Sequence, residues 1–372
     1  MVILPPIKVV HKNNIMENKK LESILDKWIK LQPLNEYDQN RLSRRFTIDF
    51  NYNSNHIEGN TLTYGQTEIL LLFGKIIGEA DVKDVHDMTA SNVALKMMSE
   101  ETLIKETPLT QNFIRTLHRT LLREDYTVYR TLPGGVQTSY TIHAGQYKTR
   151  PNSVITRYGD RFEYASPEET PALMTDLVDW YNKAEQEGIH TPIELAILFH
   201  YRYIRIHPFE DGNGRIARLL MNYILARHSY PMIVVRSRLK NQYLEALHES
   251  DLIVGSTPID GAHASLEKIR PFYKYMCNII AKEIENDILF VTERDENVWW
   301  YDGERIAFRT ATYGKILRAL QIEKHATFDY LQKEIGINRS ALQKMIRTLQ
   351  EKEYISRDNK GAWRVFITPS ID

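Results

Sequence analysis

Apolar residues recur at three- and four-residue spacing along most of the first three quarters of the chain, which is the pattern of amphipathic helices. Glycine and proline separate the repeating segments, as expected for turns. The predicted helical segments are 19–31, 36–49, 63–74, 83–98, 110–123, 167–230, 238–252 and 265–290. The fold class is therefore expected to be mainly α, a helical bundle.

Two regions depart from this helical pattern. Short runs rich in β-branched and aromatic residues, such as 136–142 and 153–158, predict hairpins between residues 130 and 164. After a break near 295–303, the tail predicts helices at 310–321, 327–335 and 339–352, then strands at 354–356 and 362–368. Three helices followed by a β-ribbon predict a winged helix-turn-helix domain.

The third helix of this tail has two chemically different faces. Its predicted exposed face carries Arg339, Gln343, Lys344 and Arg347. Its predicted buried face carries Ala341, Leu342, Ile346 and Leu349. A winged helix would present the exposed face to the major groove and phosphates of DNA. Contact with protein or formation of a homodimer is the alternative use of the domain, and the sequence leaves both open.

Composition restricts the class of protein more than its function. The 372 residues are 42% apolar and 26% charged, which excludes disordered, collagen-like and coiled-coil proteins. Equal numbers of basic and acidic residues, 48 each, give no overall attraction to nucleic acid or an anionic membrane. The single cysteine, Cys277, excludes a disulfide framework and is expected to pack in a helix. No membrane span or secretory signal is evident, so a cytoplasmic location is expected.

The segment from His207 to Arg218 carries the candidate chemistry. Pro208 ends the preceding helix, and a Gly-Asn-Gly sequence opens the next one. Glycines allow close approach of a ligand, and the free amides and positive dipole at a helix N-terminus favour phosphate. Arg215 and Arg218 lie in the first turn, where both side chains can reach the same anion.

Two further residues of this segment suggest group transfer. Asp211 beside a phosphate site is expected to hold Mg²⁺, because a hard carboxylate next to phosphate oxygens suits that ion. His207 at the loop entrance has the chemistry of a general base for an incoming hydroxyl. Together they predict transfer of a phosphorus-containing group.

The same segment resembles the signature of the Fic family, His-Pro-Phe-x-Asp/Glu-Gly-Asn-Gly-Arg-x-x-Arg, at every position. The resemblance extends over residues from about 45 to 290 and implies a Fic-type helical bundle with a small β-hairpin flap. It implies an adenylyltransferase that moves AMP from ATP to a serine, threonine or tyrosine hydroxyl of a protein. The implied domains are 1–110 (an N-terminal helical region), 111–295 (the catalytic core) and 305–372 (the winged-helix domain).

The resemblance also implies a role for each residue of the signature. His207 is the implied general base, and Asp211 the Mg²⁺ ligand. The implied nucleotide-binding residues are Phe209, Gly212, Asn213, Gly214, Arg215, Arg218 and, on a later helix beside Gln242, Tyr243 at the adenine. Phe209 is expected to anchor the loop in the core rather than to act in catalysis. A flap at about 152–164 is expected to dock an extended target segment by strand pairing, or else to cover the core edge as a loop.

The donor and the biological role stay open in the sequence. Acidic Asp211 favours AMP transfer over phosphorylation, but UMP or phosphocholine donors remain alternatives because the loop grips phosphates. A DNA-binding transcriptional regulator that uses the winged helix is an alternative from another class. A toxin of a toxin–antitoxin pair is a weaker reading, since the chain carries its own predicted brake.

That brake lies at residues 54–60, Ser-Asn-His-Ile-Glu-Gly-Asn, which resembles the inhibitory motif of the family. Ser54 and Glu58 share a face if the segment is helical, and Gly59 follows. The resemblance implies that Glu58 pairs with Arg218 and occupies the space that the γ-phosphate needs. Such an arginine–carboxylate pair is strong and removes one cation from the phosphate site.

Overall fold

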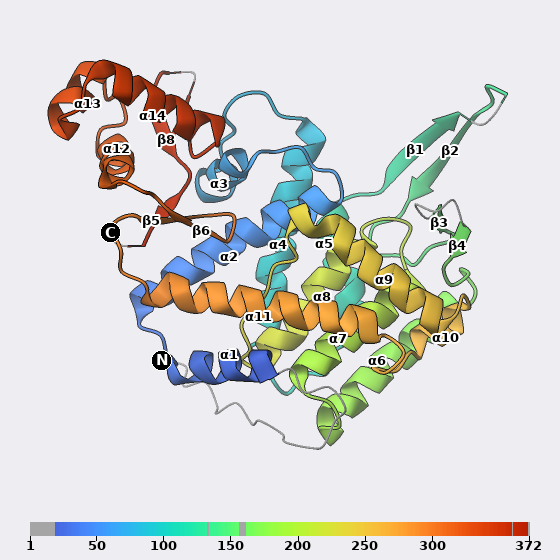
Figure 1. Ribbon diagram of the computed structural model, residues 1–372. Helices are drawn as coiled ribbons and strands as arrows, with labels where there is room; N and C mark the ends of the chain where they lie inside the picture. Colours follow the sequence, from blue (N-terminus) through green and yellow to red (C-terminus); the bar gives the residue numbers. More distant parts are fainter. Residues whose placement is uncertain (1–18, 132–133, 156–160, 359, 371–372) are drawn as a thin grey trace.

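The computed structural model describes residues 19–131, 134–155, 161–358 and 360–370 (Figure 1). The fold is mainly helical with small antiparallel sheets, as predicted. Its helices are α1 (Lys19–Lys30), α2 (Glu36–Ile57), α3 (Tyr64–Phe73), α4 (Val82–Glu101), α5 (Gln111–Leu122), α6 (Thr170–Glu187), α7 (Pro192–Ile206), α8 (Asn213–Arg227), α9 (Lys240–Val254), α10 (Pro258–Ala262), α11 (Arg270–Thr292), α12 (Ala311–Ile322), α13 (Phe328–Ile335) and α14 (Arg339–Glu351), with a 3₁₀ turn at Ser237–Leu239.

The strands form four small sheets. They are β1 (Tyr126–Thr131), β2 (Gln137–Ile142), β3 (Ser153–Ile155), β4 (Arg161–Glu163), β5 (Val298–Tyr301), β6 (Glu304–Ala307), β7 (Ile355–Arg357), β8 (Trp363–Val365) and β9 (Thr368–Pro369). β1 pairs with β2, β3 with β4 and β7 with β8, whereas β5 lies between β6 and β9. The β1–β2 hairpin projects from the helical body beside β3 and β4 (Figure 1).

Helices α7 and α8 form the centre of the main core. Nearly every side chain of α7 is buried, and the buried residues of α8 run all around the helix, because other helices cover both. Helix α7 begins with a capping box at Thr191 and Glu194, with Pro192 in the first turn. The loop that joins α7 to α8 is thereby held at both ends by buried helices. Cys277 lies buried in α11, as expected.

The C-terminal part has a separate hydrophobic cluster. The predicted three helices and β-ribbon are present as α12, α13, α14 and the β7–β8 pair. Leu342, Ile346 and Leu349 of α14 are buried as predicted, whereas Ala341 is only half-buried. Trp299 also belongs to this cluster. The identity of the unit as a winged helix and the three-domain division remain predictions.

The two faces of strand β5 pack in two different hydrophobic clusters, the C-terminal cluster and a small cluster at the end of α11. The sequence did not indicate this arrangement. Trp299 packs in the C-terminal cluster, and the next residue, Trp300, packs with Phe290 and Val291 at the end of α11. Alternation of side chains along a strand produces this division. Because three of its four residues are fully buried, β5 lacks the apolar–polar alternation that identifies a strand in sequence.

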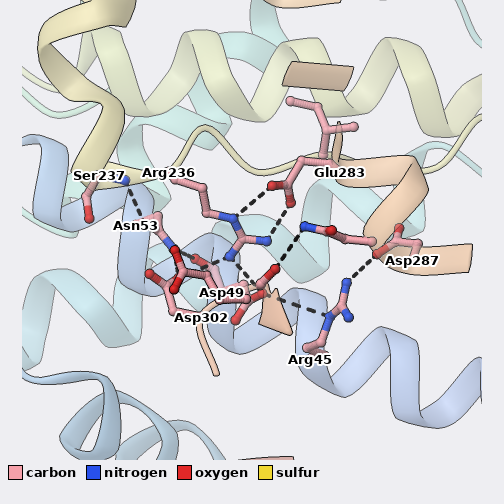
Figure 2. Close-up of polar contacts among 12 residues, drawn as sticks. Arg45, Asp49, Asn53, Arg236, Ser237, Glu283, Asp287 and Asp302 are labelled. Carbon is pink, nitrogen blue, oxygen red and sulfur yellow. Dashed lines mark hydrogen bonds and ion pairs between the residues drawn. The ribbon is translucent and has the colours of Figure 1, made fainter. Parts of the chain in front are cut away.

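A buried arginine connects the helical body to the β5–β6 turn (Figure 2). Arg236 is 2% exposed and donates to both carboxylate oxygens of Glu283, at 2.9 and 2.5 Å. Its Nη1 donates to Asp49 at 2.8 Å and to Asp302 at 3.0 Å. Gly303 has a positive φ of 69° and contacts the guanidinium so closely that any Cβ there would overlap it. The turn sequence Asp-Gly therefore favours the tight turn of the hairpin, and it also gives Arg236 a carboxylate partner and space for its guanidinium.

The same cluster holds the middle of α2. Asn53 donates to Asp302 at 2.6 Å and accepts from the amide of Ser237 at 2.7 Å. Arg45 donates to Asp287 of α11 at 2.5 Å.

Within the part of the chain that the structure describes, none of the helices combines the length and the apolar character needed to span a membrane.

Replacing Arg236 with methionine is expected to destabilise the fold by about 3–5 kcal/mol, because it leaves three carboxylates in the interior without their cation. The matched control is Arg238→Met, since Arg238 pairs with Asp302 and Glu304 but is 40% exposed. We expect this control to cost less than about 1 kcal/mol. Urea unfolding followed by circular dichroism measures both; equal losses would contradict the assigned role of Arg236.

Candidate functional site

The loop 207–212 joins the C-terminus of α7 to the N-terminus of α8. His207 ends α7 in a left-handed conformation, with φ of 54°, and its amide donates to the carbonyl of Tyr203 at 2.9 Å. Gly212 precedes α8 with φ of 76°, a conformation that favours glycine. The chain thus reverses direction in this loop through a residue with positive φ at each end, His207 and Gly212.

Two buried side chains hold this loop in shape. Phe209 is fully buried and stacks on His118 of α5, with ring centroids 3.7 Å apart. The Asn213 amide accepts from the backbone N–H of Phe209 at 3.0 Å and donates to its carbonyl at 2.7 Å. Phe209 therefore lies where a core anchor was expected. Because the Asn213 side chain is hydrogen-bonded to the backbone of Phe209, Asn213 can donate to a bound anion only through its backbone N–H.

Helix α8 presents free amides and two arginines at its start. Its first intrahelical bond runs from Ile216 N–H to the carbonyl of Gly212, so the amides of Asn213, Gly214 and Arg215 precede the regular pattern. Arg215 is buried and lies 3.6 Å from the carboxylate of Asp211. Arg218 is 2% exposed on the same helix. Positive charge and N–H donors are thus concentrated at one helix end.

Asp211 is a fixed and ionised carboxylate at the same place. Its Oδ1 accepts from the amide of Gly212 and its Oδ2 from the hydroxyl of Tyr126, both at 2.7 Å. Burial opposes ionisation, but Arg215 and these hydrogen bonds lower the pKa of Asp211 below its usual value. The side chain is 45% exposed, so it can take a cation.

This donor set fits Mg²⁺ bound together with phosphates. Among the described residues there is no group of three histidine, cysteine or acidic side chains that could form an all-protein metal site. Mg²⁺ usually takes one or two carboxylates and completes its shell with water and substrate phosphates. Asp211 next to the N-terminus of α8 meets that requirement.

His207 is held in a neutral state beside the loop. Burial, together with the nearby Lys148 ammonium, lowers the pKa of His207 to about 3. Its ring stacks on Tyr164 with centroids 3.9 Å apart. Within the described part of the chain, its Nδ1 has no hydrogen-bond partner. A neutral imidazole at neutral pH can accept a proton, which is what a general base requires.

The segment of the predicted brake lies against the same helix end. Helix α2 continues to Ile57, past the predicted end at 49, so Ser54 and Glu58 do share a face. Arg218 donates to the Ser54 hydroxyl at 3.0 Å, to the Ser54 carbonyl at 2.9 Å and to Glu58 at 2.6 Å. Gly59 follows with φ of 98°, where the chain leaves the helix.

The carboxylate of Glu58 also reaches the start of α8. A Cβ at Gly214 would overlap Glu58 Oε1, so the carboxylate in its present position packs directly against Gly214. The oxygen therefore lies over the first turn of α8, where the free amides are. An anion already occupies part of the positively charged region.

Tyr243 lies in α9 behind this region rather than at its surface. It is 2% exposed, its hydroxyl bonds to Nε2 of His200 at 2.9 Å, and its ring packs edge-on against that histidine. The flap region contains the antiparallel pair β3 and β4, with residues 156–160 outside the described residues. The roles assigned to Tyr243 and to the flap remain predictions.

Several residues of the site were missed in the sequence. His118, Tyr126, Lys148, Asn152 and Tyr164 contact the loop from positions 43 or more residues away from His207 in the chain. His118 accepts from the amide of Gly145 through Nδ1 and therefore donates from Nε2 to the carbonyl of Asp211, at 3.0 Å. No spacing in a single sequence indicates such contacts. The resemblance implied a flap at about 152–164, but it did not indicate these individual contacts.

The comparisons with known proteins agree on one family. The model of the Fic/DOC family matches residues 108–225. A solved structure described as a Fic domain containing signaling protein from Bacteroides thetaiotaomicron is 52% identical, with a TM-score of 0.68, and the match covers 73% of this chain and 96% of that chain. A Fic family protein from Desulfovibrio desulfuricans matches over 95% of this chain and 98% of its own at 18% identity and a TM-score of 0.55, which speaks for the fold alone.

Curated relatives include the protein adenylyltransferase fic-1 of Caenorhabditis elegans. It is 28% identical over 259 residues, which are 69% of this chain and 44% of that relative. The protein adenylyltransferase Fic of Nematostella vectensis is 27% identical over 282 residues, 76% of this chain and 57% of that relative. The chain thus spans about half the length of the curated relatives it matches.

The buried His118 is expected to make stability depend on pH. Burial lowers its pKa to about 4 in the folded chain, so below pH 6.5 the unfolded chain binds a proton that the folded chain does not. The folded state therefore loses stability as pH falls, by about 2 kcal/mol from this group at pH 5. His118→Gln, which cannot titrate, is expected to lose correspondingly less between pH 7 and pH 5. Urea unfolding of both proteins at the two pH values tests this; equal losses would contradict it.

Proposed function

Because the chain belongs to the Fic/DOC family, we propose that it is a protein adenylyltransferase that moves AMP from ATP to a serine, threonine or tyrosine hydroxyl of a target protein. One observation carries this proposal. The six-residue loop and the first two turns of α8 bring together a neutral histidine, an ionised aspartate, free amides and two arginines. The names of the curated relatives support the same activity.

The start of α8 is the proposed site of the ATP phosphates. Its free amides and helix dipole favour anions, and Arg215 and Arg218 supply fixed positive charge for the β- and γ-phosphates. Asp211 would hold Mg²⁺, which would neutralise part of the charge of the ATP phosphates. Tyr243 is the proposed adenine-side aromatic, acting from behind the loop.

His207 is the proposed general base. It takes the proton of the target hydroxyl while that oxygen forms a bond to the α-phosphorus of ATP and the bond from this phosphorus to the β-phosphate oxygen breaks. Pyrophosphate leaves and AMP stays on the target. The low pKa of His207 in the free protein keeps the imidazole in its neutral form at neutral pH, which is the form that can accept a proton.

Glu58 is the proposed inhibitor of the same site. Its carboxylate pairs with Arg218 and lies over Gly214, so it withdraws one cation from the phosphates and adds a negative charge where the γ-phosphate would bind. Ser54 strengthens the arrangement because its hydroxyl and carbonyl orient the Arg218 guanidinium. ATP bound with its γ-phosphate in a productive position would have to displace Glu58.

The β3–β4 pair is the proposed docking site for the target. Two short antiparallel strands leave an edge to which an extended segment can add main-chain hydrogen bonds. A target strand placed there would run next to Tyr164, which stacks on His207. The cytoplasm is the proposed location. A homodimer, and UMP or phosphocholine as donors, remain within the proposal, since the loop recognises phosphates.

DNA binding by α14 is the second candidate function. Its exposed face carries Arg339, Gln343, Lys344 and Arg347, as predicted for a winged helix. Arg339 and Arg347 each pair with an exposed carboxylate, at 2.7 and 2.8 Å, and such pairs open at little cost to reach DNA phosphates.

The first experiment measures transfer of label from α-³²P-labelled ATP with Mg²⁺ to proteins of a cell lysate. Glu58→Gly is expected to increase labelling by about 100-fold over the natural chain, a change equal to about 3 kcal/mol. Glu58→Gln, which keeps the size of the side chain without its charge, is expected to give an intermediate increase. His207→Ala in the Glu58→Gly background is expected to abolish labelling.

Two outcomes would count against the proposal. Absence of labelling by a folded Glu58→Gly protein that binds ATP would exclude ATP as the donor. Equal labelling by the natural chain and Glu58→Gly would exclude Glu58 as the inhibitor. Ser54→Ala serves as a further variant, with a smaller expected increase because the Glu58 pair remains.

DNA binding is tested by gel shift with random-sequence duplex DNA. If α14 contacts phosphates, affinity is expected to fall steeply with salt, and Lys344→Glu is expected to weaken binding at every sequence. Lys315→Glu, in α12, is the control substitution of the same charge change. An affinity that does not change with salt, or equal effects of the two substitutions, would contradict a role of α14 in DNA binding.

A further inference from the structure

The segment 148–152 is bound along the loop that contains His207, immediately before β3. The amide of Lys148 donates to the carbonyl of Pro208 at 2.9 Å, and Asn152 donates to the carbonyl of Phe209 at 3.0 Å. Farther out on the same segment, Arg150 pairs with Glu210 at 3.4 Å. The strand that enters the flap is therefore attached to the loop by main-chain and side-chain contacts.

Lys148 is the buried centre of these contacts. Its residue is 3% exposed, and its Nζ donates to the carbonyls of Ile206 and His207, at 3.2 and 2.9 Å, and to Asn152 Oδ1 at 2.8 Å. An ammonium has three N–H donors, and three oxygens accept them. The two carbonyls belong to the C-terminal end of α7, where the helix dipole favours a cation.

Burying this amine carries a cost, since desolvation lowers the pKa of Lys148 to about 7. The nearest acidic group acting on it is Glu169, which precedes α6 and opposes the lowering without forming a pair with it. The cost is offset by the three oxygen acceptors, since an apolar side chain would leave the last carbonyls of α7 and Asn152 Oδ1 without this donor.

The far end of the flap also reaches His207. Tyr164 directly follows β4 and stacks on the imidazole, and its amide bonds to the carbonyl of Asn152 at 3.4 Å. Both strands of the hairpin thus end on the residues around the proposed base. His207 is therefore contacted from both ends of the hairpin, at its ring by Tyr164 and at its carbonyl by Lys148.

We propose that Lys148 is a positioning residue, whose buried ammonium joins the flap to the backbone of His207 so that a target segment on the flap presents its hydroxyl to the imidazole. This inference rests on the proposed function. It assigns to Lys148 an effect on transfer to the target, with binding of ATP at the start of α8 unchanged. Lys148 lies at the end of α7, and its Nζ bonds, within the described part of the chain, go to Ile206, His207 and Asn152.

The test is made in the Glu58→Gly background with three further substitutions. Lys148→Met removes the charge and the donors but keeps an unbranched chain; Lys148→Arg keeps both; Arg150→Met removes an exposed cation of the same segment that contacts the loop only through Glu210. Binding of a non-hydrolysable ATP analogue and the rate of label transfer at saturating ATP are measured for each.

Lys148→Met is expected to reduce the transfer rate by about 100-fold, the loss typical of a misplaced reacting group, with little change in affinity for the analogue. Lys148→Arg is expected to restore most of the rate, and Arg150→Met to stay close to the parent. Transfer by Lys148→Met at the parent rate, or a parallel loss of ATP affinity, would overturn the inference. If the Glu58→Gly parent itself transfers no label, it is the proposed function that fails.

Amide hydrogen–deuterium exchange tests the inference without any activity. Lys148→Met is expected to increase exchange both in 207–212 and in the flap segments 152–155 and 161–164, while exchange in α7 and α8 stays at the parent level. Lys148→Arg is expected to retain the parent pattern. Unchanged exchange in either segment would overturn the proposed coupling, and a general increase throughout the chain would reduce Lys148 to a residue of the core.

Discussion

The position of α2 depends on the buried guanidinium of Arg236. It binds carboxylates from α2, from α11 and from the β5–β6 turn at once, and Gly303 is the residue type that leaves room for it. Without this cation, Asp49 and its neighbours would face one another in the interior, where unpaired charge is costly. The last turn of α2, with Ser54 and Glu58, is therefore placed by contacts made one and two turns earlier in the same helix.

The loop after α7 depends on a different kind of order. Its shape is set by the stacking of Phe209 on His118 and by the side chain of Asn213, all of which are buried and none of which needs a ligand. Within the described part of the chain, the first amides of α8 precede its regular hydrogen bonds, and Nδ1 of His207 has no partner. Such a preorganised arrangement is the usual basis of electrostatic catalysis.

Sequence reasoning found the local part of this arrangement and missed the part made at long range. Helical spacing, the Gly-Asn-Gly start and the adjacent arginines predicted where α7 and α8 meet, because these signals lie within a few residues of one another. The end of α2 was placed too early because its last two turns, with Asn51, Asn53 and Asn55, lack helix-forming side chains; these amides are buried through bonds to the carbonyls four residues back or to Asp302. Lys148 and Tyr126 lie far from the loop in the sequence and reach it only in the folded chain. Strand β5, buried on both faces, gave no alternation to recognise.

In the proposed inhibition, the carboxylate of Glu58 acts as a ligand tethered to its own receptor, the start of α8. A tethered ligand competes at a fixed effective concentration, often in the millimolar range for short flexible connections, whatever the concentration of the protein. Its strength then depends on how firmly α2 is held, and Asn53, one turn before Glu58, bonds directly to Asp302 of the β5–β6 turn. In the proposed inhibition, the packing of the β5–β6 hairpin against α2 would therefore help to set the ATP concentration at which Glu58 is displaced. This packing lies at a distance from the site itself.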